Sequence, residues 1–328
     1  MRPMKYKILD ILKTHHGKWV SGEKICKILN ISRTAVWKNI NSLKKDGYEI
    51  ATKRHIGYKL VYIPDILLPH EIKSGLNTKY IGGEVIYYNS IDSTNDAAKK
   101  IAGEKKAHGT VVVAEKQTRG KGRMGRQWFS ALGRDLLFSV ILYPKASVVK
   151  VAQISMLAAV AVTEALNKTF GVKSGIKWPN DLLVDGKKIC GVLLEMSAEA
   201  DCMRYVILGI GINVNSDKSD WTNEIIDRTT SLKLVLGKNI SRVEVLKSVL
   251  EELELWYEKW CDFGFDPVLD KWRALCVSQK KRATVKTLEK EYIGWIEGID
   301  DEGALVLKLD DGTKKVFFSA DVSLRGGF

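Results

Sequence analysis

Positive charge is concentrated at the beginning of this 328-residue chain. Residues 1–64 contain eleven lysines and three arginines against four carboxylates, a net charge of +10, whereas the whole chain carries +13. Such a concentration is typical of a domain that binds a polyanion. Pro64 and Pro69 flank a short connector, which predicts a domain boundary near residue 64. The chain therefore divides into a small basic domain and a larger remainder.

Apolar residues in the basic domain recur at the spacing of three amphipathic helices. Ser21 and Ser32 are suited to cap the second and third helices, and Gly47 to end the third. The residues predicted to face inward are Ile8, Leu9, Ile11 and Leu12 in the first helix, Ile25, Ile28 and Leu29 in the second, and Val36, Ile40 and Leu43 in the third.

The other face of the third helix is polar and basic, which suits the major groove of DNA. Two short strands, Glu49–Thr52 and Gly57–Tyr62, bracket a basic turn that is placed like the wing of a winged helix-turn-helix. The alternative is a protein-binding module whose basic face is only solvated, but the charge of the domain favours DNA. The residues predicted to contact DNA are Arg33, Thr34, Trp37, Lys38, Asn41, Lys53 and Arg54.

Cysteine usage and apolar runs predict the compartment. The five cysteines are widely spaced without a CxxC pair, which argues against a disulfide framework or a zinc site. The basic start has no apolar run behind it, so no signal peptide is predicted. The most apolar stretch, Ile154–Leu166, is too short to span a bilayer. We therefore expect a soluble cytoplasmic protein with no membrane partner.

Strand-like and helix-like segments alternate from about residue 80 to 270, which predicts a sheet covered by helices. The predicted strands are Val85–Tyr88, Val111–Glu115, Leu136–Leu142, Gly191–Glu195 and Tyr205–Asn213, and the predicted helices are Ile154–Thr169 and Val243–Trp260. After residue 280, short runs separated by Gly and Asp predict a small antiparallel barrel with strands Ala283–Thr287, Ile293–Ile299, Leu305–Leu309 and Lys314–Phe318.

The segment Gln117–Trp128 is the most informative for chemistry. Three glycines and four cations lie in its eight residues 119–126. Glycines allow close backbone approach, and N–H groups with cations suit a phosphate or a carboxylate. The alternative is an exposed basic loop or an RGG-like contact to nucleic acid.

A second motif, Lys177–Asp181, is followed by a predicted hairpin turn at Asp185-Gly186. The next strand then begins with Lys187 and Lys188, of which only one can point inward. Regular alternation places Ile189 on the face of Lys187, and Cys190 on the face of Lys188. Periodicity does not decide which face belongs to a site.

Two glycines at alternate positions, Gly209 and Gly211, leave one face of a strand without side chains, so a ligand could lie against the backbone. Relief of crowding within a sheet is the alternative. No GxGxxG opens a helix here, so a dinucleotide fingerprint is excluded. Hydroxyl and amide groups of Ser93–Asn95 stand at a probable helix start.

Taken in order, these motifs resemble the biotin–protein ligases, and with the winged helix in front the chain is similar to the bifunctional biotin ligase–biotin operon repressors of bacteria. The resemblance rests on Asp92–Asn95, Gly120–Trp128, Lys177–Asp181, Lys188–Glu195 and Gly209–Asn215. It implies that MgATP and biotin give biotinyl-5′-AMP, and that biotin then passes to a lysine of the biotin carboxyl carrier protein of acetyl-CoA carboxylase.

The resemblance also implies an α+β protein of three domains. Residues 1–64 would form the winged helix-turn-helix, and residues 65–278 a mixed α/β catalytic domain similar to class II synthetases. Residues 279–328 would form an SH3-like barrel that helps to hold ATP and the carrier. Biotin, ATP and Mg²⁺ are the implied ligands, and no ligands for the Mg²⁺ are assigned.

Site residues follow from the motif positions. Lys188 and Arg123 are the implied catalytic residues. The implied biotin-binding residues are Ser93, Thr94, Asn95, Gln117, Arg119, Gly120, Lys121, Gly122, Arg123, Lys188, Gly191 and Gly209. The implied ATP- or adenylate-binding residues are Arg123, Arg126, Trp128, Asn180, Lys188, Gly211, Asn213 and Trp221.

The family also implies regulation, in which the adenylate orders the Gly120–Trp128 loop and favours a homodimer that binds the biotin operator. One residue departs from the pattern, because Lys121 stands where the family usually has arginine. Two alternatives remain open: a lipoate or octanoyl transferase of related fold, and a repressor that senses a ligand without catalysis.

Overall fold

The computed structural model describes residues 3–104, 108–199, 202–287 and 289–324. The chain separates into two compact units, residues 1–66 and 67–328. The catalytic segments and the C-terminal strands share the second unit, so the predicted boundary at residue 278 stays a proposal. Among the described helices, none is long and apolar enough to cross a membrane.

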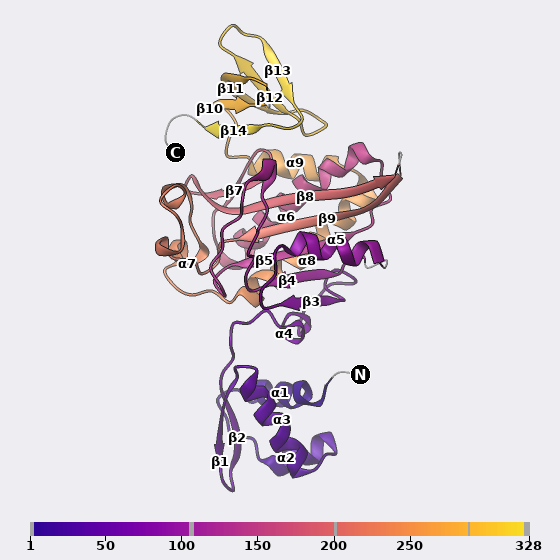
Figure 1. The fold of residues 1–328 in the computed structure, drawn as a ribbon, viewed down its shortest axis with the longest axis vertical. Helices are drawn as coiled ribbons and strands as arrows, with labels where there is room; N and C mark the ends of the chain where they lie inside the picture. Colours follow the sequence, from indigo (N-terminus) through magenta and orange to yellow (C-terminus); the bar gives the residue numbers. More distant parts are fainter. Residues whose placement is uncertain (1–2, 105–107, 200–201, 288, 325–328) are drawn as a thin grey trace. The chain divides into compact units, whose positions relative to one another are not determined.

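The first unit is a winged helix-turn-helix around one apolar core (Figure 1). Its caps form as predicted, since Ser21 accepts a hydrogen bond from the Lys24 N–H and Ser32 from the Ala35 N–H, both at 3.1 Å. The elements are α1 (Met4–Thr14), α2 (Gly22–Leu29), α3 (Arg33–Lys45), β1 (Glu49–Lys53) and β2 (Gly57–Tyr62).

Most of the predicted core of this unit is buried, but one residue was assigned wrongly. Ile28 is 54% exposed, whereas Ile25 on the same helix is fully buried. Helix α2 has only eight residues, and Ile28 near its C-terminal end does not reach the core. Helical spacing alone overestimated the buried width of this helix.

The second unit contains a seven-stranded sheet in the order β3-β4-β5-β9-β8-β7-β6 within the described residues. All neighbouring strands are antiparallel except the parallel pair β3 and β4. The strands are β3 (Val85–Tyr88), β4 (Val111–Ala114), β5 (Leu136–Leu142), β6 (Gly175–Lys177), β7 (Asp181–Val184), β8 (Lys187–Glu199) and β9 (Cys202–Ile212).

Helices cover both faces of this sheet, as the alternation of segments predicted (Figure 1). The long helices α6 and α8 pack with the main core on one face, and α5 packs a smaller cluster of alanines on the other. The helices are α4 (Pro69–Lys73), α5 (Thr94–Glu104), α6 (Ala152–Phe170), α7 (Leu232–Leu236), α8 (Arg242–Phe263) and α9 (Asp266–Leu275). The start of α5 reaches β8 and β9, where the Asn95 amide donates to Glu195 and lies against Gly209.

The C-terminal strands form a five-stranded antiparallel sheet in the order β13-β12-β11-β10-β14. Trp178 joins it to the central part, because the indole N–H donates to the Gly303 carbonyl at 3.0 Å. The strands are β10 (Arg282–Lys286), β11 (Glu291–Ile299), β12 (Leu305–Leu309), β13 (Lys314–Phe317) and β14 (Asp321–Leu324). Strands β6, β7 and β14 were not predicted.

The wing depends on a glycine. Gly57 has φ +131°, and a Cβ there would collide with the backbone carbonyl of Val20, which pairs with Tyr58 beside it. We expect Gly57→Ala to destabilise the first unit by about 1–3 kcal/mol, because strain and collision add. The measurement is the midpoint of the first thermal unfolding transition. Gly17→Ala is the matched control, with φ +75° but no atom within 4 Å of the new Cβ. Equal shifts for both variants would contradict the role of the Val20 contact.

Candidate active site

A cavity of about 750 Å³ lies beside the start of α5 and strands β8 and β9. Its walls come from segments far apart in the chain: the start of α5, strands β7 to β9, the Gly120–Trp128 loop, residues 225–229 and β14 of the C-terminal sheet. Most residues predicted for the site line this cavity: Ser93, Thr94, Asn95, Gln117, Lys121, Gly122, Arg123, Arg126, Trp128, Asn180, Lys188, Gly191, Gly209 and Gly211.

The Gly120–Trp128 loop is a narrow hairpin. The Gly122 N–H donates to the Arg126 carbonyl at 2.7 Å, and the Trp128 N–H donates to the Gly120 carbonyl at 2.9 Å. Met124 at the tip adopts φ +53°, a left-handed conformation that closes the turn. This fold of the loop lets its side chains reach both sides of the cavity.

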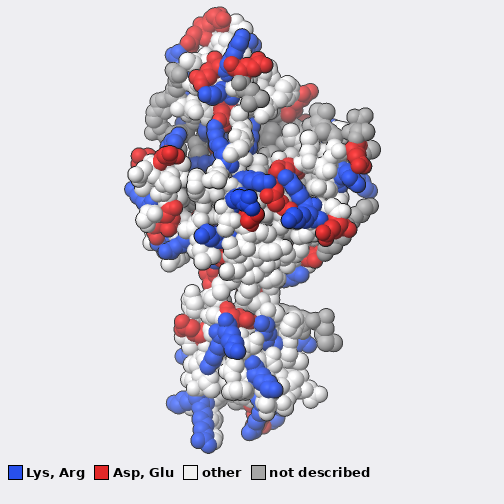
Figure 2. All heavy atoms as spheres, in the orientation of Figure 1, with Lys and Arg blue, Asp and Glu red and all other residues white. Residues whose placement is uncertain are grey.

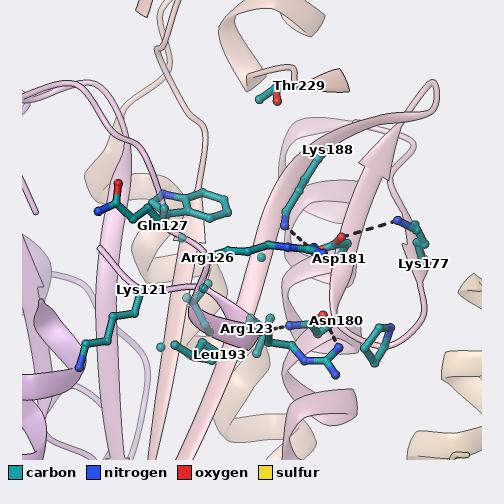
Figure 3. A pocket seen from close by; sticks show the side chains of 18 of the residues that line it. Lys121, Arg123, Arg126, Gln127, Lys177, Asn180, Asp181, Lys188, Leu193 and Thr229 are labelled. Atoms are coloured by element: carbon teal, nitrogen blue, oxygen red, sulfur yellow. Dashed lines mark hydrogen bonds and ion pairs between the residues drawn. The ribbon is translucent and has the colours of Figure 1, made fainter. Parts of the chain in front are cut away.

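Two arginines of the loop reach the C-terminal sheet and β7. Arg123 donates to the Ser319 hydroxyl at 3.0 Å. It also donates to the side-chain oxygen of Asn180 at 3.3 Å (Figure 3). Arg126 forms an ion pair with Asp321. Burial lowers the pKa of Arg123, although nearby Asp181 opposes the shift. Both guanidinium groups are therefore held at the cavity by partners that an anionic ligand could replace.

The position of Lys188 is decided by a bulge in β8. Lys188 and Cys190 pair with the consecutive residues Leu183 and Leu182 of β7, so Ile189 is one residue too many for regular pairing. The expected alternation is therefore wrong here, because an extra residue changes the faces on one side of it. Cys190 is fully buried and does not share the face of Lys188.

The bulge brings Lys188 onto the same face as Gly191, beside the cavity. A Cβ on Gly191 would lie 3.3 Å from the Lys188 Nζ. That ammonium lies 2.6 Å from Asp181 Oδ1, and the Lys177 ammonium lies 3.9 Å from Asp181 Oδ2 (Figure 3). One carboxylate thus holds two lysines at the centre of the site.

Electrostatics favour an anionic ligand. The lining contains six cationic residues and the carboxylates Asp181 and Asp321. Desolvation lowers the pKa of Lys177, and the charges of Lys188, Arg126 and Arg228 act in the same direction against the attraction of Asp181. A polyphosphate or carboxylate would supply the negative charge that this cluster lacks. The six cationic residues are Lys121, Arg123, Arg126, Lys177, Lys188 and Arg228.

The part of the lining that comes from the start of α5 and from Gln117 is polar and uncharged. Gln117 Oε1 accepts from the Thr94 N–H at 2.8 Å and from the Thr94 hydroxyl at 3.1 Å. The buried Ser139 hydroxyl lies 2.8 Å from the Thr94 hydroxyl and 2.6 Å from Asn95 Oδ1. These contacts orient the amide and hydroxyl groups for neutral hydrogen-bonding partners.

The glycines of β8 and β9 make room for side chains of the protein itself. A Cβ on Gly209 would collide with the Asn95 amide, and one on Gly211 would lie 2.6 Å from the indole of Trp128. Lys188 Nζ stands 5.4 Å from the centre of the same indole. The predicted bare face therefore exists, and in this structure Trp128 and Asn95 lie against it.

Four predicted residues do not line the cavity. Arg119 turns outward to pair with Asp92, and Gly120 only shapes the hairpin. Asn213 is buried and donates to the Thr230 carbonyl at 3.0 Å. Asn213 therefore supports the segment that ends at Thr230, which includes the lining residues Arg228 and Thr229. Trp221 is 7% exposed and packed outside the lining.

Other lining residues were missed: Lys177, Asp181, Ile225, Arg228, Thr229, Asp321 and Ser323. The first two lie in a motif that the sequence singled out, so their signal was available. The other missed residues lie in the 225–229 loop, which has no periodicity, and in β14, which is far along the chain. Nothing in the local sequence of either segment predicts that it lines the cavity. Within the described residues, no group of three or more His, Cys, Asp or Glu could hold a metal ion.

A second surface suited to a polyanion lies on the first unit. The predicted contacts Arg33, Thr34, Trp37 and Lys38 are exposed on α3, and Asn41 is half-buried. Lys53 and Arg54 are exposed at the wing. Figure 2 shows Lys and Arg side chains spread over this unit. The outer face of α3 and the wing thus present cations and hydrogen-bonding groups together, as a DNA-binding surface requires.

A cationic cavity with a neutral polar end, joined in one chain to a basic winged helix, defines a class: an anion-activating enzyme that carries a DNA-binding domain. Three family models match the chain. Residues 87–213 match the Biotin/lipoate A/B protein ligase family, residues 5–59 an HTH domain, and residues 281–325 the Biotin protein ligase C terminal domain.

Individual relatives span nearly the whole chain. The bifunctional ligase/repressor BirA of Bacillus subtilis (strain 168) is 40% identical over 317 residues, which cover 97% of each protein. The bifunctional ligase/repressor BirA of Escherichia coli (strain K12) is 29% identical over 94% of each. The structure of biotin protein ligase from Aquifex aeolicus in complex with biotin and ATP is 31% identical, with a TM-score of 0.64 over 74% of this chain and 99% of that one. The chain belongs to the biotin protein ligase family, and within it to the bifunctional ligase/repressors.

The seating of Trp128 is testable through the glycine beneath it. In Gly211→Ala the new methyl group would lie within 3 Å of the indole, so Trp128 must shift and disturb Lys188 beside it. We expect a loss of about 100-fold in the rate of ligand activation, as for a displacement of about 1 Å at a reacting centre. Ligand-dependent ATP–pyrophosphate exchange measures the rate. Gly103→Ala, where nothing lies within 4 Å, is the control. Wild-type activity in Gly211→Ala would show that Trp128 need not lie there.

Proposed function

We propose that this chain activates biotin with ATP to biotinyl-5′-AMP, transfers biotin to a lysine of the biotin carboxyl carrier protein, and represses the biotin operon as an adenylate-bound dimer. One observation carries the enzymatic part. The Lys188 side chain lines the same cavity as the neutral hydrogen-bonding groups of Thr94 and Gln117 and the guanidinium groups of Arg123 and Arg126. Biotin offers a neutral ureido ring at one end and a carboxylate at the other, and ATP supplies the phosphates.

The first step joins two anions, which repel each other. A carboxylate oxygen of biotin forms a bond to the α-phosphorus of ATP, the bond from that phosphorus to the β-bridging oxygen breaks, and pyrophosphate leaves. Lys188 is the cation that would stand between carboxylate and α-phosphate, and Arg123 and Arg126 would neutralise the phosphates. To do so they must exchange Asp181, Asn180 and Asp321 for the ligand.

In the second step the neutral amine of the carrier lysine forms a bond to the acyl carbon of the adenylate. The bond from that carbon to the phosphate oxygen breaks, AMP leaves with the electron pair, and the nitrogen loses a proton to solvent. AMP is a good leaving group because the same cations stabilise its phosphate. The carrier would approach the part of the cavity that β14 lines, which agrees with the family's use of the C-terminal barrel.

Biotin would bind at the neutral end. Ser93, Thr94, Asn95 and Gln117 would hold the ureido ring, and the backbone of Gly209 the ring system. The adenylate would extend towards Trp128, Asn180 and Gly211. Asn213 would act through the segment that it supports, and stacking of Trp221 on adenine stays a prediction.

Magnesium is proposed as part of the nucleotide. The cavity fits an ion that arrives on the phosphates, because its cations exceed its carboxylates and Asp181 is the carboxylate available at the centre. When bound, Mg²⁺ supplies charge neutralisation of the triphosphate. The residues of this chain then orient the nucleotide around it.

Regulation would couple the two surfaces. Biotinyl-AMP would stabilise the Gly120–Trp128 hairpin and a homodimer, and two winged helices would then bind an inverted-repeat operator. Because the ligand favours the dimer and the dimer favours DNA, ligand and DNA affinities are linked. Abundant unmodified carrier would consume the adenylate and release repression.

The enzymatic proposal is tested by ATP–pyrophosphate exchange with biotin, lipoate and octanoate. We expect exchange with biotin alone, and a loss of about 100-fold or more in Lys188→Ala because a preorganised charge is removed from the point of attack. Lys187→Ala, one residue away and exposed, is the matched control and should retain exchange. Exchange with lipoate instead, or undiminished exchange in Lys188→Ala, would refute the assignment.

The regulatory proposal is tested by binding to biotin-operon operator DNA and by sedimentation. We expect biotin with ATP to tighten binding and to shift the wild-type chain from monomer to dimer. Lys188→Ala should lose this response and regain it with preformed biotinyl-AMP. Arg33→Ala together with Lys38→Ala should weaken DNA binding with exchange unchanged, since both lie on α3. Operator affinity that is the same with and without ligand would contradict the linkage.

A further inference from the structure

The Gly120–Trp128 hairpin is attached to the rest of the protein on two sides. On one side, Arg123 and Arg126 contact Ser319 and Asp321 of the C-terminal part. On the other, the Lys121 ammonium lies 2.5 Å from Asp96 Oδ1 in the first turn of α5. Figure 3 shows the Lys121 side chain pointing away from Arg123 and Arg126.

We propose that Lys121 is a positioning residue that latches the hairpin to α5, and that it does not contact the substrate. The inference deepens the proposed function and rests on it, because the cavity is taken as the biotin and ATP site. It gives a physical reason for the departure at this position, where the family's usual arginine is replaced by lysine. An ammonium suits a single carboxylate oxygen, whereas a guanidinium suits a bidentate partner.

The latch belongs to a chain of alternating charges. The Lys99 ammonium lies 3.8 Å from Asp96 Oδ1 and 2.5 Å from Glu195 Oε1. Glu195 Oε2 accepts from the Asn95 amide at 2.7 Å. Lys121 is therefore connected through Asp96, Lys99 and Glu195 to the wall of the cavity.

The end of this chain lies inside the proposed biotin pocket. Asn95 is 4% exposed, accepts from the Ser139 hydroxyl at 2.6 Å and fills the space that Gly209 leaves free. Asp96 lies between the Lys121 and Lys99 ammonium groups, and Lys99 pairs in turn with Glu195. The hairpin and the Asn95 amide are thereby positioned together.

The exposure of the pair makes the latch reversible. The Lys121 and Asp96 side chains are 42% and 38% exposed, so solvent and salt weaken their attraction. A weak contact suits a loop that must open for substrate to enter and for adenylate to leave. Asp96 is further stabilised by its place in the first turn of a helix, where a negative charge is favourable.

A charge swap tests the latch. Lys121→Glu and Asp96→Lys each replace attraction by repulsion, and the double variant restores the pair with the charges exchanged. The first readout is the rate of cleavage by an arginine-specific protease after Arg123 and Arg126, sites that all variants keep. We expect each single variant to be cleaved about three- to fivefold faster, as the loss of an exposed ion pair implies, and the double variant to return to the wild-type rate.

The second readout separates positioning from substrate contact. We expect KM for biotin to rise about threefold in each single variant with kcat little changed, and to recover in the double variant. Lys145→Glu, the same charge change at an exposed lysine away from the cavity, should leave both readouts unchanged.

The outcomes are distinct. Cleavage of the double variant at the single-variant rate would show that the two side chains do not act as a pair. Restored protection with biotin KM still raised would show that Lys121 contacts the substrate, and would overturn the proposal. Absence of biotin-dependent exchange in the wild-type chain would instead reject the ligase assignment, while the cleavage rates would still decide whether the latch exists.

Discussion

Positive side chains held close together in a partly buried cavity repel one another, and this constraint shapes the site. Lys177 and Lys188 stay in place because both approach Asp181, while Arg126 pairs with Asp321 and Arg123 is hydrogen-bonded by Asn180 and Ser319. Each of these contacts neutralises or satisfies a cation that an anionic ligand would bind more strongly. The protein thus keeps a phosphate site assembled through internal partners of moderate strength, which a ligand can replace without rebuilding the cavity.

The sheet supplies the rigid side of this arrangement. Glycines in β8 and β9 let the Trp128 indole and the Asn95 amide lie directly on the backbone, so the neutral and charged ends of the cavity share one floor. A buried ion pair between Glu115 and Arg242, at 2.6 Å, lies behind it at the end of β4. Gln117 follows two residues later. The neutral end is therefore fixed by the core, whereas the charged end depends on the hairpin and the C-terminal sheet.

This division has a functional consequence for a family whose members combine ligation with repression. Under the proposed function, the rigid end would select the ureido ring before the hairpin closes, and closure would then complete the phosphate-binding part. The hairpin would, under the same proposal, change partners when the ligand arrives, and the same closure would then serve as a signal. Coupling between ligand binding and hairpin closure needs only a contact that is stronger with the ligand bound than without it.

The sequence by itself determined what local rules govern. Serine caps at Ser21 and Ser32, the turn at Asp185-Gly186 and the apolar stripe of α3 all formed as predicted, because each depends on residues a few positions apart. Most of the site residues that the family motifs predicted line the cavity. Within the described residues, these local signals placed the strands of four residues or more in the centre of the sheet correctly, apart from β7.

Tertiary structure alone decided which groups meet. Regular alternation put Cys190 on the face of Lys188, but the extra residue Ile189 breaks that alternation, and a bulge is visible only in the pairing with β7. The partners of the hairpin, Asp96 in α5 and Asp321 in β14, lie far from it in the sequence. No periodicity could therefore connect them to the hairpin. Charge and spacing predicted an anion site, and long-range packing chose the partners that hold it, because the attraction between two charges depends on their distance in space and not along the chain.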